Sequence, residues 1–182
     1  MEFSIELPEP DDARDLFLLA KERLLDVNDW NSLFAGKEYH IMLTTPKGQK
    51  LQRDAHVGDM MVISATNGQS IDMWVNIRKI QYDFFPDIGS ESISMLLEMS
   101  SSQAGNRIVQ EGQNVETILI KREGNSLTAH CNIGNELPDP EAETPNEHLN
   151  TETDLHPVLN IPKTQLQQLL QGFIAIDLSI NT

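Results

Sequence analysis

The sequence has one cysteine, few basic residues and no long hydrophobic run. A single cysteine, Cys131, excludes an internal disulfide and favours a reducing compartment. No apolar stretch approaches the about 18 residues that a membrane-spanning helix needs. The acidic start of the chain lacks the basic and apolar regions of a signal peptide. We therefore expect a cytoplasmic protein.

Basic residues are outnumbered more than two to one by acidic residues. Thirteen Lys and Arg face 28 Asp and Glu, which gives a net charge of -15. Binding to nucleic acid or to anionic lipid needs a basic surface, so we expect neither kind of partner. With 182 residues and 39% hydrophobic side chains, the chain is long enough for one domain with its own core.

Alternation of apolar and polar residues is the dominant pattern. In residues 71–81, Met73, Val75 and Ile77 alternate with Trp74 and Arg78. A period of two is typical of a strand with two different faces. Because strand patterns precede and follow this stretch, we expect it to be the central strand of an antiparallel sheet. Which of its faces is buried is open.

The order of the remaining patterns predicts an α+β fold. We expect a first strand at 3–7, a helix at 11–25 and a short helix around Trp30. Further strands are expected near 39–44, 60–64, 93–99, 115–123 and 126–133. A last helix begins at Pro162 and is expected to reach about residue 178, although 174–180 also fits a strand. Residues 134–160 are acidic and predict a long exposed loop.

The chain resembles the START-like helix-grip superfamily, also called polyketide cyclase or Bet v 1-like. The stretches FSIELPEP and LLDVNDWNSLF are similar to that superfamily's first strand and helix pair. The resemblance implies a curved antiparallel sheet of about seven strands that packs against a C-terminal helix, with two N-terminal helices. It also implies a cavity for a small apolar ligand between sheet and C-terminal helix. Relatives that activate chaperones or act as cyclases or hydrolases supply two alternative functions.

A second, local resemblance is to an uncharacterised bacterial protein family. It rests on VGD at 57–59, WV at 74–75 and EGNSLTAHCNIGNELPDP at 123–140. The family pattern has an Asp-Trp-Val strand, which Met73 interrupts here. It also has a Gly-Arg-Asn-Glu segment, whose Arg is missing between Gly134 and Asn135. The resemblance brings no function with it.

Catalytic and cofactor signatures are absent from the sequence. It contains no Gly-rich phosphate loop, CxxC, HExxH or GxSxG motif, so we expect no cofactor and leave enzymatic activity open. If the polar faces of the strands line a cavity, polar and aromatic side chains there would bind the ligand. These candidates are His40, Asp72, Trp74, Arg78, His130, Asn132 and Glu136. An outward Trp74 would instead favour a homodimer.

Histidines in the acidic loop offer metal-binding chemistry without a recognisable spacing. His148 and His156 match no standard site, so we expect a solvated loop and no metal. Cys131 alternates with apolar neighbours and is expected to be a small core residue rather than a nucleophile.

Overall fold

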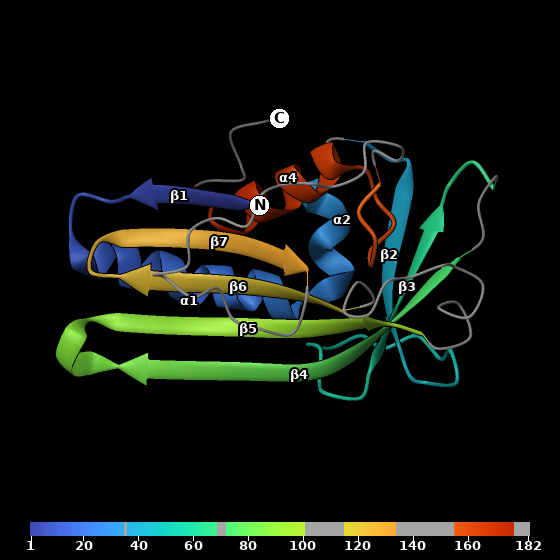
Figure 1. Cartoon of the computed structure of the whole chain (residues 1–182), viewed down its shortest axis with the longest axis horizontal. Coiled ribbons are helices and arrows are strands. Elements are labelled where there is room, and N and C mark those ends of the chain that lie inside the picture. Colours follow the sequence, from blue (N-terminus) through green and yellow to red (C-terminus); the bar gives the residue numbers. More distant parts are fainter. Residues whose placement is uncertain (35, 69–71, 101–114, 134–154, 177–182) are drawn as a thin grey trace.

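The protein folds into a seven-stranded antiparallel sheet with helices on one face (Figure 1). The computed structural model describes residues 1–34, 36–68, 72–100, 115–133 and 155–176. The strands are β1 (Glu2–Glu6), β2 (Tyr39–Thr44), β3 (Met60–Ala65), β4 (Met73–Phe85), β5 (Ser90–Met99), β6 (Val115–Glu123) and β7 (Ser126–Ile133). Their order in the sheet is β1-β7-β6-β5-β4-β3-β2. The sheet curves into a half-barrel, which confirms the expected α+β class and strand number.

Three α-helices accompany the sheet in the described part of the chain. They are α1 (Pro10–Leu25), α2 (Trp30–Leu33) and α4 (Lys163–Phe173). Pro10 occupies the first turn of α1, where its missing N–H costs nothing, and Asp11 and Asp12 add negative charge at the positive end of the helix dipole. The apolar residues of α1 lie on one side and are buried, as their spacing predicts: Ala13, Leu16, Phe17, Ala20 and Leu24.

The core fills the space between the helices and the sheet. Ile118 and Ile120 of β6 and Leu127 and Ala129 of β7 alternate with more exposed residues and face α1 and α4. From α4, the buried side chains are Leu166, Leu169, Leu170 and Phe173. The other face of the sheet bears the half-exposed residues, as expected for an antiparallel sheet covered on one side.

The 71–81 stretch forms a strand from Met73 onward, but the position of this strand in the sheet differs from our prediction. It belongs to β4, which continues to Phe85, while β5 is the middle strand in the sheet order. Met73, Val75 and Ile77 are buried in the core, whereas Trp74 is half-buried and Arg78 is exposed on the opposite face. Strand pairing depends on distant segments, and local alternation cannot predict which strand is central.

The last helix ends earlier than expected. α4 stops at Phe173 rather than near residue 178, and Ala175 and Ile176 are not helical. Arg23 of α1 explains this end, because its Nη1 donates hydrogen bonds to the carbonyl oxygens of Gly172, Phe173 and Ala175 at 3.2, 3.1 and 2.7 Å. Residues 177–182 lie outside the described ranges.

The prediction of an exposed loop over residues 134–160 is wrong at its C-terminal end. The 134–154 part, with Glu136 and His148, lies outside the described residues. From Leu155 onward the chain forms a packed turn in which Val158, Leu159 and Ile161 are fully buried. Burial of these three apolar side chains offsets the entropy lost when this part of the chain is ordered.

No helix in the described ranges has the length and apolar character to cross a membrane.

Candidate functional site

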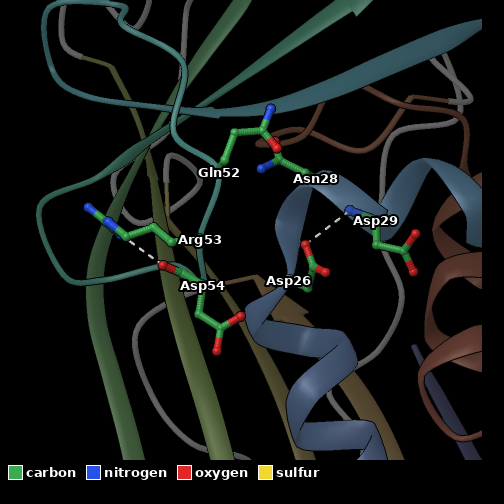
Figure 2. A pocket seen from close by; sticks show the side chains of 6 residues that line it. All are labelled: Asp26, Asn28, Asp29, Gln52, Arg53 and Asp54. Carbon is green, nitrogen blue, oxygen red and sulfur yellow. Dashed lines mark hydrogen bonds between the residues drawn. The ribbon is translucent and has the colours of Figure 1, made fainter.

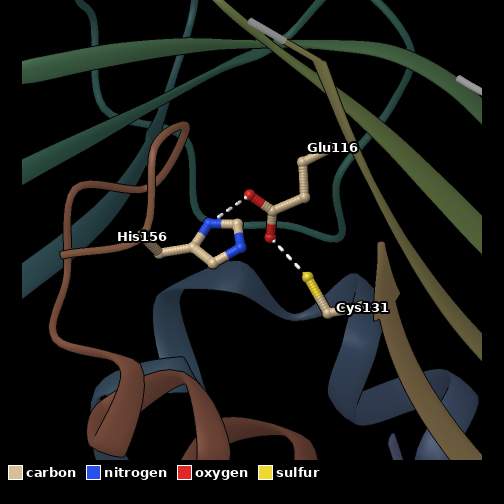
Figure 3. Close-up of side chains that lie close together, drawn as sticks. All are labelled: Glu116, Cys131 and His156. Carbon is tan, nitrogen blue, oxygen red and sulfur yellow. Dashed lines mark hydrogen bonds and ion pairs between the residues drawn. The ribbon is translucent and has the colours of Figure 1, made fainter. Parts of the chain in front are cut away.

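Three side chains with metal-binding chemistry meet in the interior, although they are far apart in the sequence. Glu116 comes from β6, Cys131 from β7 and His156 from the turn before α4 (Figure 3). Their potential ligand atoms all lie within 4.8 Å of one another. All three residues are buried, with exposed fractions of 0%, 3% and 7%.

The register of two neighbouring strands brings Glu116 and Cys131 together. Cys131 lies opposite Ile118, and Glu116 is two residues before Ile118 on the same strand. Residues two apart on a strand share a face, so Glu116 and Cys131 are diagonal neighbours on the face covered by helices.

A tight turn of the chain holds His156 above these two residues. The His156 N–H donates to the Ile161 carbonyl at 2.7 Å, and the Asn160 N–H donates to the His156 carbonyl at 2.8 Å. Asn160 has a positive φ of 53°, which an Asn tolerates better than most residues. Since Ile161 and its neighbours are anchored in the core, the backbone of His156 is fixed.

Short polar contacts join the three side chains, but two polar atoms lack a hydrogen bond. The Cys131 thiol donates to Glu116 Oε1 at 2.7 Å. His156 Nδ1 lies 2.8 Å from Glu116 Oε2, which is ion-pair distance. The two atoms thus contact each other as an ion pair, and neither forms a directed hydrogen bond with a described residue.

The surroundings keep the Cys131 thiol protonated. Burial raises the pKa of Cys131 well above its usual value, and the negative charge of Glu116 and the thiol hydrogen bond to it raise this pKa further. The N-terminal ammonium acts weakly in the opposite direction. A nucleophilic cysteine needs a lowered pKa and access for its substrate. Cys131 has neither, which agrees with our expectation of a core residue.

The same three groups form a suitable donor set for a transition metal. Thiolate, imidazole and carboxylate are the ligands that Zn²⁺ takes in proteins, at about 2.0–2.3 Å. The short thiol–carboxylate hydrogen bond is the alternative that these ligands adopt when no ion separates them. A divalent ion would also bond His156 Nδ1 and Glu116 Oε2, the two atoms that contact each other without a hydrogen bond.

A polar depression of about 330 Å³ lies elsewhere on the surface (Figure 2). Its lining consists of Asp26, Asn28, Asp29, Gln52, Arg53 and Asp54. Several of its polar groups are already bonded within the protein. Asn28 joins the Leu43 N–H and the Leu51 carbonyl, and Arg53 binds Asp59 and the Asp54 carbonyl. Asn28 and Arg53 therefore hold the loops around the depression together.

Six of the seven ligand-binding residues expected from the sequence lie in the described ranges, and they come from different parts of the sheet. His40 is exposed on β2, and His130 is half-buried on β7 beside Glu2. Four strands, β3 to β6, lie between them. Arg78 pairs with Glu98 on the outer face, and Asn132 is half-buried at the end of β7. Asp72 is exposed just before β4, so these side chains do not form one site.

Sequence reasoning missed Glu116 and misplaced His156. We expected His156 in a solvated loop, yet it is buried against Glu116. One signal was available: Glu116 occupies the position that alternation with Ile118 and Ile120 assigns to the core, and a carboxylate there requires a partner. His156 could be found in a similar way, since the apolar VLNI that follows it predicts a buried turn.

The chain matches no family model, no curated protein and no solved structure.

Proposed function

We propose that this protein binds a divalent transition metal ion, with zinc favoured, through Glu116, Cys131 and His156. One observation carries the proposal: three ligand side chains from three separate segments meet in the core, with Glu116 Oε2 and His156 Nδ1 left without a hydrogen bond. Buried polar groups are nearly always paired, and the unpaired ones call for a specific explanation. A metal ion provides that explanation for both atoms together.

Charge balance favours a doubly charged cation. When a metal binds, the Cys131 thiol gives up its proton, because the thiolate is the ligand. One thiolate and one carboxylate then neutralise the two positive charges of the ion, and a neutral imidazole adds none. The raised pKa of Cys131 makes this uptake dependent on pH, with weaker binding in acid because the proton competes with the metal.

Burial favours a structural role for the bound ion. The ion would join β6, β7 and the turn that leads into α4, so it would fasten the C-terminal segment to the sheet. Binding only to the folded state would stabilise the protein by RT ln(1 + [L]/Kd), about 2.7 kcal/mol when the metal concentration is 100 times Kd.

Isothermal titration of the metal-free full chain with zinc, followed by cobalt absorption spectroscopy, tests this proposal. We expect one ion per chain and a thiolate-to-cobalt charge-transfer band. Cys131→Ser and Glu116→Gln preserve the size of the side chains and should weaken binding by about 100-fold or more, since even changes outside the ligand shell cost 10–100-fold. The charge-transfer band should vanish in Cys131→Ser.

His130→Asn is the matched control, because His130 is on β7 next to Cys131 and pairs with the exposed Glu2 on the other face. It should bind zinc as the unaltered protein does. Unchanged zinc affinity in both ligand variants, or equal loss in the His130 control, would contradict the proposal.

We also propose that the protein has a START-like helix-grip fold. In support, the order strand, two helices, six strands, helix agrees with the expected order, and β1 closes the sheet next to β7. A small apolar ligand between sheet and α4 is a second candidate, which the curvature of the sheet favours. Leu166, Leu169, Leu170 and Phe173 are fully buried there, so such a ligand would have to displace α4.

A further inference from the structure

Among the described residues, the second half of β4 is an open edge of the sheet. β3 pairs with β4 only from Met73 to Asn76, and the Gly58 and Asp59 backbone then bonds Ile77. Beyond Ile77, β4 continues to Phe85 beside β5, and no other described strand or loop forms backbone hydrogen bonds with it (Figure 1). Alternate residues of an edge strand leave their N–H and C=O groups without a partner in the sheet.

Exposed apolar side chains gather along this edge. Tyr82, Phe84 and Phe85 are 46%, 46% and 55% exposed, although aromatic residues make up only 5% of the sequence. Ile88 follows in the turn after β4, and Val57 is exposed on the loop that ends the open stretch at Ile77. An edge that is both unpaired and apolar is a site for adding another strand.

Two opposite charges on the edge are placed to complement each other in a second copy. A β-bulge lies between Ile77 and Lys79, after which alternation is regular. Tyr82 contacts Phe17 and Lys21 of α1, so Ile80 and Tyr82 share the helix-covered face. Lys79 and Asp83 therefore share the outer face and lie symmetrically about Gln81.

We propose that the protein forms a homodimer by antiparallel pairing of the two β4 edges about a twofold axis at Gln81. In this register Lys79 lies opposite the partner's Asp83, and Ile80 lies opposite the partner's Tyr82. Symmetry repeats each contact, as in any isologous interface. Oppositely charged and aromatic–aliphatic pairs stabilise facing strands, whereas like charges destabilise them. A Lys on an edge strand generally disfavours pairing with another strand. In the proposed register, Lys79 instead faces an acidic side chain of the partner.

The net charge of -15 on each copy opposes association. Because salt screens this repulsion, the strength of dimerisation depends on the ionic strength. At physiological salt, charges separated by more than about 8 Å are largely screened, while the facing Lys79 and Asp83 side chains are closer than that. At physiological salt, the attraction between Lys79 and Asp83 is therefore screened less than the repulsion between the net charges of the two copies.

Sedimentation velocity of the full chain over a concentration series at physiological salt tests the dimer. We expect a monomer–dimer equilibrium in the unaltered protein. Lys79→Asp and Asp83→Lys each place like charges opposite one another twice, and each should weaken dimerisation by about tenfold, equivalent to two repulsive contacts of about 0.7 kcal/mol. The double variant restores opposite charges and should recover the affinity.

Recovery in the double variant is decisive, because Lys79 and Asp83 of one chain are four residues apart along an extended strand and cannot pair with each other. Circular dichroism and urea unfolding of each variant check that its fold is retained. A monomer at every concentration, a dimer that ignores the single reversals, or a double variant that stays as weak as the singles would each overturn the proposal.

Discussion

At the scale of single residues, the buried carboxylates differ in how completely they are paired. Glu91 accepts from Arg122 at 2.8 Å and from the Tyr82 hydroxyl at 3.1 Å. Asp59 accepts from both terminal nitrogens of Arg53, at 2.7 and 3.0 Å, and from the His56 N–H at 2.8 Å. Glu116 has only the Cys131 thiol as a hydrogen-bond donor among the described residues. Glu116 therefore makes fewer hydrogen bonds than the other two buried carboxylates, and its second oxygen contacts His156 Nδ1 only as an ion pair.

The Asp59–Arg53 pair predicts a pH-dependent contribution to stability. Burial alone would raise the pKa of Asp59, but the hydrogen bonds from Arg53 and His56 outweigh burial and hold this pKa below its usual value. Because the folded-state pKa is lowered, the stabilisation is present above the unfolded-state pKa, about 3.9. It is lost as the pH falls through the folded-state value.

Asp59→Asn should therefore lower the free energy of unfolding by about 2 kcal/mol at pH 7, the cost of losing hydrogen bonds to a charged group. The difference between variant and unaltered protein should shrink below about pH 4. Urea unfolding at a series of pH values measures both. Asp54→Asn, an exposed change on the same loop, serves as the control. A difference that stays constant down to pH 2 would show that the charge of Asp59 is not responsible.

At the scale of elements, α4 is positioned by contacts with α1 and α2. The Trp30 and Phe173 rings pack edge to face with centroids 5.4 Å apart, and Arg23 bonds the end of the helix. Gly172 allows α2 to approach closely, because a Cβ added there would lie 3.0 Å from Leu33 Cβ. A glycine in this position lowers helix propensity but permits the packing of two helices.

Gly172→Ala tests which of these two effects is larger. Helix propensity alone predicts a gain of about 1 kcal/mol. Overpacking against Leu33 costs about 1–3 kcal/mol, because neither Cβ can move without its backbone. We expect a net loss in the free energy of unfolding, measured with urea. The exposed Gln171→Ala on the same helix should change it little. A more stable Gly172→Ala protein would mean that the α2–α4 contact is loose.

The order of these elements could be predicted from the sequence, since alternation and helical spacing are local. The α1 stripe and the strand from Met73 to Ile77 are clear examples. The end of α4 could not be predicted, because Arg23 binds it from about 150 positions away in the chain. The open edge of β4 was equally hidden, since it depends on where β3 stops pairing. The candidate metal site could not be predicted for the same reason, because Glu116, Cys131 and His156 come from three distant segments.

At the scale of the whole molecule, the first described segment and the turn around His156 both contact β7. The Met1 ammonium donates to the Cys131 carbonyl at 2.9 Å, and β1 pairs along β7. The turn that carries His156 lies near the side chain of the same Cys131, together with Glu116. A metal ion there would join the last described segment to the strand that already holds the first. The metal site that we propose would thus also hold the two segments together.

Zinc-edge anomalous diffraction from crystals grown with equimolar zinc tests that claim most directly. We predict one strong anomalous peak in the core, about 2.0–2.3 Å from Cys131 Sγ, His156 Nδ1 and a Glu116 carboxylate oxygen. In that state the thiol–carboxylate hydrogen bond is absent. Ordered density that retains this hydrogen bond, with no anomalous peak among the three side chains, would contradict the account.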